Sequence, residues 1–93
     1  MTCNEVFQLA QDKGYYLFDP IRRSDYIELC MLQKHLRDEH NIDIEIENQY
    51  TDATYKCYSA KISAPSGEEL TEHFNTYEKA LLQAIYESLN LIK

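Results

Sequence analysis

The chain contains few of the residues that form flexible linkers or covalent cross-links. Its 93 residues include no tryptophan, two glycines, two prolines and three cysteines. So few glycines and prolines argue against long flexible linkers. An odd number of cysteines without a Cys-x-x-Cys pair argues against a disulfide framework, so we expect free thiols in a reducing cytoplasm. A chain this short predicts one globular domain, residues 1–93, with little room for a deep catalytic cavity.

Basic residues are scarce as well. Nine Lys and Arg stand against sixteen Asp and Glu, which gives a net charge of −7 at pH 7. This balance argues against direct nucleic-acid binding and against docking on anionic membranes, because both depend on clustered cations. It suits either simple solubility or a basic partner. No apolar run approaches the roughly 20 residues of a membrane span, and the N-terminus has no signal-peptide pattern, so we expect a cytoplasmic protein without a membrane partner.

The common signatures of catalysis and metal binding are missing too. There is no phosphate-binding loop and no His-Glu-x-x-His motif. His35 and His40 are five residues apart at the end of an expected helix, so we expect them on different faces, and Cys30 is not spaced to complete a zinc site. Cys57 is expected to be half-exposed, and a nucleophile there would need a base, for which only the remote His73 is available. The sequence therefore predicts a protein that is not an enzyme and has no cofactor.

Apolar residues at helical spacing predict three helices. The first covers residues 2–13 and is followed by Gly14; the second covers residues 24–39 and ends at Asn41 in a left-handed conformation. The third begins after Asn75 and extends to about residue 92. The expected N-caps are Thr2 for the first helix, Ser24 or Asp25 for the second, and Asn75 for the third. Asp25 and Asn75 each have a glutamate three residues on, the spacing of a capping box. The stripe expected to face the core on the second helix contains Tyr26, Leu29, Leu32 or Gln33, and Leu36, widened by Cys30 and Met31.

Period-two alternation predicts a hairpin between the second and third helices. Residues 41–48 alternate Ile42, Ile44 and Ile46 with three acids, and residues 54–64 form the second strand, with a five-residue loop at 49–53. Residues 15–18 are expected to form a short strand, and residues 68–74 either an edge strand or an ordered loop. The fold class is α+β, a small antiparallel sheet of two to four strands packed by helices on one face, in the order α-β-α-β-β-α.

The three acids of the first hairpin strand are Asp43, Glu45 and Glu47. Alternate strand residues lie roughly 6.6–6.8 Å apart on one exposed face, with Lys61 nearby. No pocket or EF-hand spacing surrounds them, which argues against catalysis or a metal. Two interpretations stay open: a solvated face, or a contact surface for a basic partner, to which Tyr50 and Tyr55 would add aromatic area. These five residues are the candidate partner-binding site.

A second cluster is basic. Arg22, Arg23, Lys34 and Arg37 lie before and along the second expected helix. Asp25, Glu28, Asp38 and Glu39 interleave with them, which favours a salt-bridged surface. RNA binding through this patch stays an alternative.

Two segments carry a family resemblance. Residues 32–46, LQKHLRDEHNIDIEI, and residues 74–92, FNTYEKALLQAIYESLNLI, resemble parts of short acidic, functionally uncharacterised proteins encoded by phages and prophages, with LAQDKGYYL at residues 9–17 as a weaker match. His35 stands where that family usually has a tryptophan. The matching residues are caps and core positions, so the resemblance implies a fold and a mobile-element setting and does not imply a mechanism.

That setting shapes the functional hypothesis. By analogy with other small acidic proteins of mobile elements, we expect a non-catalytic protein in the cytoplasm of a bacterial host that inhibits a host protein, with an anti-CRISPR-type inhibitor as the leading case. Its acidic strand would dock on a basic surface of an RNA-guided nuclease. The alternatives are a structural or housekeeping phage protein acting as a homodimer or larger homo-oligomer, and RNA binding through the basic patch.

Overall fold

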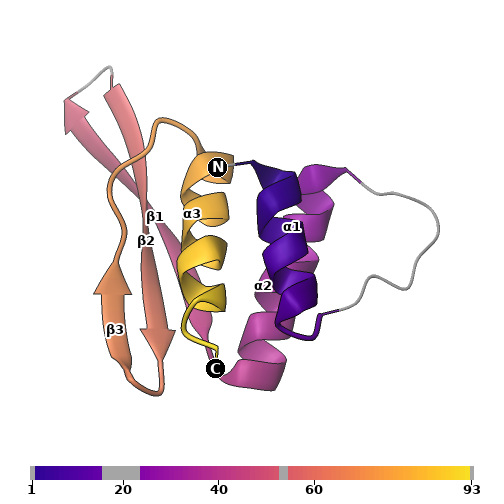
Figure 1. Cartoon of the computed structure of the whole chain (residues 1–93). Coiled ribbons are helices and arrows are strands. Elements are labelled where there is room, and N and C mark those ends of the chain that lie inside the picture. Colours follow the sequence, from indigo (N-terminus) through magenta and orange to yellow (C-terminus); the bar gives the residue numbers. More distant parts are fainter. Residues whose placement is uncertain (1, 16–23, 53–54, 93) are drawn as a thin grey trace.

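The computed structural model describes residues 2–15, 24–52 and 55–92, with the side chains of residues 49–52, 55 and 56 excepted. The elements in chain order are α1 (Cys3–Asp12), α2 (Asp25–His40), β1 (Asp43–Asp52), β2 (Tyr55–Ala64), β3 (Gly67–Leu70) and α3 (Tyr77–Leu89) (Figure 1). The α+β class and the small antiparallel sheet are confirmed. Tyr15 belongs to no strand, and the rest of the strand expected at residues 15–18 lies outside the described residues.

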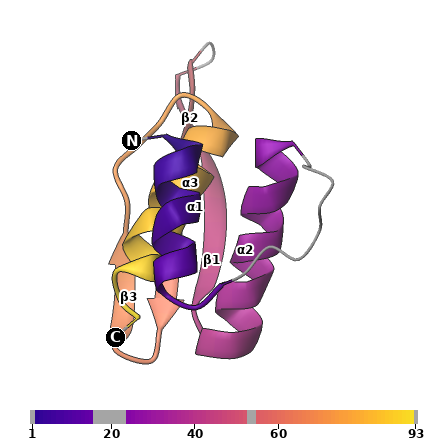
Figure 2. The ribbon, with the colours of Figure 1, turned by 45° about the vertical axis from the view of Figure 1, so that its right-hand side comes forward.

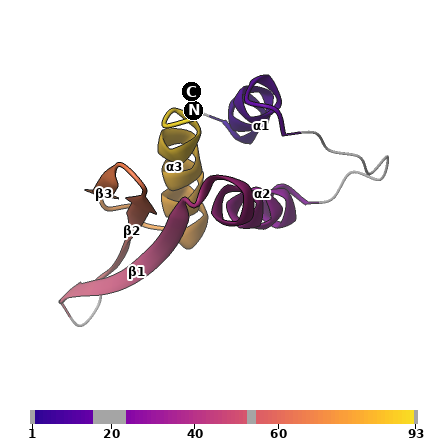
Figure 3. The same cartoon turned by 90° about the horizontal axis from the view of Figure 1, so that it is seen from below.

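Helix α3 occupies the centre of the molecule. It contacts β1 and β2 on one side and α1 and α2 on the other, so the three helices cover a single face of the sheet. Figures 1 and 3 show this layering, with the strands on one side of α3 and the two N-terminal helices on the other. None of the described helices covers the opposite face of the sheet, as the sequence predicted.

The core forms where the apolar residues of the two hairpin strands meet α3. Ile42 and Ile44 of β1 and Ala60 and Ile62 of β2 are buried in one cluster with residues of α3. Helix α3 contributes the following buried residues: Leu81, Ala84, Ile85 and Leu89. Ile46 is half-buried at the margin of this cluster. The alternation of isoleucine with acids therefore decides which face of β1 is buried.

The hairpin is longer and tighter than expected. β1 and β2 pair antiparallel from Asp43 opposite Ser63 to Asp52 opposite Tyr55, with an irregularity between Tyr50 and Asp52. The prediction of a five-residue loop at 49–53 was wrong, because Tyr50 is a good strand former and the ladder continues through Tyr50 to Asp52. Figure 2 shows the far end of this hairpin extending beyond the helices.

The chain turns again after β2 and adds a third strand. β3 pairs with β2 from Gly67 opposite Ala64 to Leu70 opposite Lys61, giving the sheet order β1-β2-β3. Gly67 has φ +135°, a conformation that residues with a side chain rarely adopt. Residues 68–74 are thus part strand and part irregular, with an isolated bridge between Tyr58 and Phe74 beyond β3.

Short polar side chains define the helix ends. Thr2 and Ser24 cap α1 and α2, each accepting a hydrogen bond from a backbone N–H three residues on. Asn41 ends α2 with φ 56°, and the Ile42 N–H donates to the Leu36 carbonyl at 3.1 Å. This six-to-one bond is the Schellman arrangement, so the predicted left-handed end of α2 is confirmed.

Two details of the helix predictions were wrong. Tyr26 and Met31 are 42% and 38% exposed and lie outside the buried stripe of α2. The buried apolar residues Leu29, Leu32 and Leu36 make a narrower stripe, because the main contacts of α2 with the described elements are those with α3 and β1. At α3 the cap is Thr76 in place of Asn75: its hydroxyl accepts from the Lys79 N–H at 3.2 Å.

Replacing Thr76 with alanine should destabilise the protein by about 1 kcal/mol, because the Lys79 N–H loses its acceptor at the start of α3. Asn75→Ala is the matched control and should change the free energy of unfolding by less than about 0.5 kcal/mol. Urea unfolding followed by circular dichroism measures both values. A larger loss in Asn75→Ala than in Thr76→Ala would restore Asn75 as the cap.

Candidate functional site: the acidic outer face of the sheet

The face of the sheet that the described helices leave uncovered carries the predicted row of acids. Asp43, Glu45 and Glu47 lie opposite Ser63, Lys61 and Ser59 of β2. Asp43 and Glu45 are exposed and Glu47 is half-buried. Because directly paired residues share one face of a sheet, the three carboxylates line the β1 side of the outer surface.

Strand β3 completes this surface. Glu68 pairs with Ser63 and Leu70 with Lys61, so both belong to the same outer face as the acids of β1. Leu70 is 73% exposed, and Lys61 Nζ lies 3.6 Å from Glu68 Oε2. We call this set the acidic face, and its members are Asp43, Glu45, Glu47, Lys61, Glu68 and Leu70. Glu68 and Leu70 were missed from the sequence because their strand pairing depends on the Pro65–Gly67 turn and not on a local pattern.

The acidic face has an unbalanced charge. It contains four carboxylates and one ammonium group, that of Lys61, which is paired with Glu68. Neither Asp43, Glu45 nor Glu47 forms an ion pair with a residue in the described part of the chain. The exposed Lys61–Glu68 pair contributes at most about 1 kcal/mol to stability. Because the Lys61 ammonium group is paired with Glu68, the β1 carboxylates can still attract an external cation.

The two tyrosines predicted for the site lie near the hairpin end. Tyr50 pairs with Lys56 and Tyr55 pairs with Asp52. Along β1, Tyr50 continues the alternation of the isoleucines and not that of the acids. The side chains of both tyrosines lie outside the described residues, so their part in partner binding stays a prediction.

Cys57 is buried, only 5% exposed, which corrects the expectation of a half-exposed thiol. β2 is the central strand of the sheet, flanked by β1 and by the segment after β3, in which Thr71 and Phe74 bond to Ala60 and Tyr58. The burial of Cys57 does not favour a reactive thiol there.

Two histidines that were expected on different faces are in contact. The ring centroids of His35 and His40 are 5.3 Å apart, and the Tyr15 ring lies 4.7 Å from that of His35. Side chains on a helix tilt toward its N-terminus, so a ring on the last residue of α2 can reach back to the preceding turn. Burial lowers the pKa of His35, and the neighbouring His40 lowers it further, against smaller opposing effects of Glu39 and Asp38.

This cluster predicts a pH dependence of stability. Because the pKa of His35 is lowered in the folded state, the unfolded chain binds this proton more readily. The stability contributed by neutral His35 is therefore present above the unfolded pKa, about 6.5, and is lost as the pH falls below it. We expect the urea midpoint to fall more between pH 7.5 and 5.5 in the native protein than in His35→Phe. His73→Phe is the control and should show the native drop; an equal drop in all three proteins would remove His35 as the cause.

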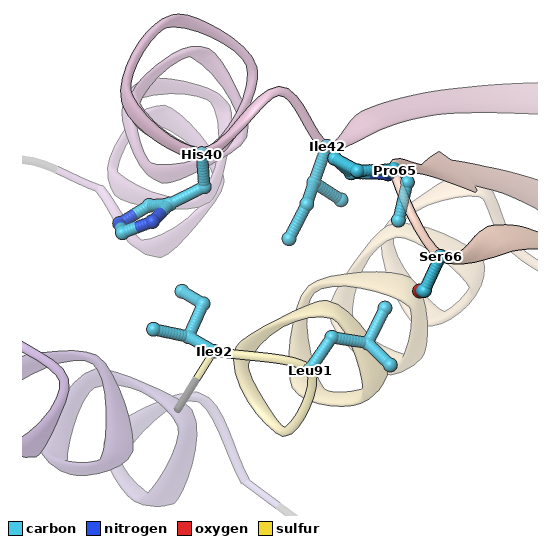
Figure 4. Close-up of a pocket in the computed structure, with 7 residues that line it drawn as sticks. His40, Ile42, Pro65, Ser66, Leu91 and Ile92 are labelled. Carbon is cyan, nitrogen blue, oxygen red and sulfur yellow. The ribbon is translucent and has the colours of Figure 1, made fainter.

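A shallow cleft of about 370 Å³ lies near the C-terminal ends of α2 and α3. It is bounded by the end of α2, the β2–β3 turn and the residues after α3, and is lined by His40, Ile42, Ala64, Pro65, Ser66, Leu91 and Ile92. Figure 4 shows His40 at one end and Ser66 at the other, with Leu91 and Ile92 between them. The serine is thus not placed for activation by the imidazole, and nucleophilic catalysis is not supported at this cleft.

The part of the basic cluster that the structure describes is paired with acids. Lys34 Nζ and Arg37 Nε each lie 3.5 Å from a carboxylate oxygen of Asp38. Arg22 and Arg23 lie outside the described residues. Glu28, expected on this salt-bridged surface, is instead buried at 7% exposure, and its Oε2 has no hydrogen-bond partner among the residues described. The observed pairing favours a salt-bridged surface over a patch open to phosphates.

Other ligand classes receive no positive support. In the described ranges no group of three or more His, Cys, Asp and Glu is arranged to hold a metal ion. None of the described helices combines the length and apolar character needed to cross a membrane. Comparisons with protein-family models, curated proteins and solved structures found no match. The phage resemblance of residues 32–46 and 74–92 therefore stays a prediction.

Proposed function

We propose that this protein is a non-catalytic binding protein that recognises a basic surface of another protein through the acidic face. The observation that carries the proposal is the row of Asp43, Glu45 and Glu47 on the face of the sheet that the described helices leave uncovered. Such a row attracts Lys and Arg side chains, and charge complementarity increases association rate and specificity more than affinity.

The apolar part of the same surface supports protein recognition. Leu70 is largely exposed beside Lys61, so the acidic face combines charge with one exposed apolar side chain. Protein interfaces have an apolar centre within a polar rim, whereas a purely solvated face needs no such residue. An exposed leucine alone is common, and its place next to the acids is what supports a contact surface.

For the partner, we propose a bacterial host protein with a basic channel, with an RNA-guided nuclease as the leading case. The support is the excess of sixteen acids over nine bases, together with the phage resemblance of the sequence. An acidic protein of this size can compete with nucleic acid for such a channel, because both present negative charge to the same cations. In this proposal the protein is an inhibitor in the host cytoplasm.

The test compares two charge reversals. Asp43→Lys/Glu45→Lys changes the acidic face, whereas Asp12→Lys/Glu39→Lys makes the same change of net charge on exposed helix residues. Each protein, with the native chain, is used to capture proteins from host lysate and is then added to a purified host RNA-guided nuclease cleaving its target DNA. We expect the native chain and the helix variant to retain the same partner and to slow cleavage, and the strand variant to bind it at least about tenfold more weakly.

Salt gives an independent measurement. Binding that depends on exposed charges should weaken as ionic strength rises from about 0.05 to 0.3 M, because the Debye length shortens over this range. A partner that binds both charge variants equally would contradict the acidic face as the contact. Unchanged DNA cleavage with the native chain would contradict the nuclease as the partner and leave the binding face open to other basic proteins.

A further inference from the structure

The free edge of β1 has main-chain groups that point away from the sheet. Tyr58 exchanges two main-chain hydrogen bonds of 2.7 Å with Phe74, and the Ala60 carbonyl accepts from the Thr71 N–H at 2.9 Å. The main-chain N–H and C=O groups of these alternate residues of β2 therefore point toward β3 and the segment after it. The main-chain groups of the residues between them point toward β1. Their partners Asp43, Glu45 and Glu47 are therefore the residues of β1 whose main-chain groups form hydrogen bonds with β2. Ile44, Ile46 and Asn48 direct their N–H and C=O groups away from the sheet.

Among the described residues, a side-chain hydrogen bond covers this edge at its start. The Gln33 side chain of α2 donates to the Ile44 carbonyl at 2.9 Å. Beyond that point β1 runs away from α2, as Figure 3 shows. The main-chain groups of Ile46 and Asn48 have no hydrogen-bond partner among the described residues. A row of unpaired N–H and C=O groups is a template for another strand.

The other edge of the sheet is less suited to pairing. β3 has four residues against ten in β1, and the chain leaves the ladder after Leu70. Short edge strands are one way in which proteins avoid pairing with other chains. The β1 edge, in contrast, continues from Ile46 to the irregularity after Tyr50.

Charge decides which strand fits this edge. A strand added there lies about 4.8 Å from β1, and its outward side chains come directly beside Asp43, Glu45 and Glu47. A second copy of this chain, pairing through its own β1, would bring three more carboxylates to that place. Like charges directly opposite are destabilising, so self-pairing is disfavoured, whereas a strand with Lys or Arg at alternate positions is complementary.

We propose that the β1 edge between Ile46 and Tyr50 accepts an extended segment of the partner protein that carries Lys or Arg at every second residue. Two of its cations lie beside Glu45 and Glu47, and the residues next to these cations form main-chain hydrogen bonds with Ile46 and Asn48. In such strand addition the main-chain bonds supply affinity and the side chains supply specificity. This inference rests on the proposed function, because it specifies how the basic partner is held.

The probe is a synthetic peptide of four Lys-Thr repeats with blocked ends. In the bound register its threonines lie opposite Ile46 and Asn48, so their N–H groups point at β1. The control peptide has the same charge but N-methylated threonines, which cannot donate. Fluorescence anisotropy measures both affinities, and amide shifts of Ile46 and Asn48 locate the contact. We expect the dissociation constant to rise about tenfold with N-methylation, from the loss of one or two main-chain hydrogen bonds.

A protein variant tests the same edge from the other side. Asn48→Pro removes an outward N–H and leaves the ladder to β2 intact, since proline is tolerated at such edge positions. Asn48→Ala keeps the N–H. We expect about tenfold weaker peptide binding with proline and a change within about twofold with alanine. If the proline variant does not fold, the N-methylated peptide on the native chain decides.

The outcomes separate this inference from the proposed function. Binding weakened by Asp43→Lys/Glu45→Lys but unaffected by N-methylation would overturn strand addition and leave the acidic face as the contact. Binding unaffected by the charge reversal would overturn both. No binding of the Lys-Thr peptide at low salt would overturn the strand-addition inference, and peptide-induced shifts confined to other surfaces would do the same.

Discussion

Replacing Leu81 with alanine is expected to lower the free energy of unfolding by about 3 kcal/mol. Leu81 is fully buried on α3, the helix that contacts the sheet and both other helices. Removing its branched end leaves a cavity that neither layer can close without moving the other. Small domains have only about 5–15 kcal/mol of stability, so this single change removes a large part of it.

Leu70→Ala is the matched control for this variant. It removes the same atoms from a side chain that is largely exposed on the acidic face, and should cost less than about 0.5 kcal/mol. Urea unfolding of the two variants and the native chain measures the difference. Equal losses in the two variants would show that α3 does not hold the core as described. If Leu70→Ala remains stable but loses partner binding, it is also a clean probe of the acidic face.

The core was predictable because its signal is local. Isoleucine at every second position of residues 42–46 and apolar residues at helical spacing in residues 77–89 each define one buried face, and burying both requires that they meet. The same alternation is enough to assign Asp43, Glu45 and Glu47 to the outer face. Which residues of β1 lie on that face was thus predictable, but whether a partner uses it is not decided by alternation.

The features that were not predictable depend on contacts between distant segments. The extension of the hairpin to Tyr50 and Asp52 follows from their pairing with β2, and Glu68 joins the acidic face only because the next turn returns the chain beside it. His35 meets His40 through the tilt of side chains at a helix end, which residue spacing alone does not express. Cys57 has the alternation of the outer face, but its place on the central strand of the sheet buries it, so the expected half-exposure was wrong.

The free edge of β1 is the least predictable part of the candidate site. Alternation in the sequence predicts a strand but not its neighbours, so it cannot distinguish an edge from a central position. The edge is defined by the sheet order β1-β2-β3 and by the Gln33 contact to Ile44, both of which join segments that are separate in the sequence. The same order places the acids of β1 beside unpaired main-chain groups, and this combination is what favours a basic extended partner over a second copy of the chain.

Replacing Thr71 with valine should destabilise the protein by about 2 kcal/mol, because it leaves a buried donor unpaired. Where the chain leaves β3, the Thr71 hydroxyl accepts from the Ala60 N–H at 2.8 Å and donates to the Glu72 carbonyl at 3.0 Å. A side chain thereby takes the place of a main-chain acceptor in the ladder. Valine keeps the shape of threonine and removes both hydrogen bonds, whereas Ala60 stays fully buried.

Thr71→Ser is the control, since it keeps the hydroxyl and loses one methyl group; it should retain most of the stability that valine loses. Hydrogen exchange gives the sharper measurement, because the Ala60 amide should exchange faster in Thr71→Val than in Thr71→Ser, relative to the amides of α1. Equal protection of Ala60 in both variants would mean that another acceptor replaces the hydroxyl. A selective loss in valine would show that Thr71 holds the segment after β3 against β2, and with it the position of Leu70 on the acidic face.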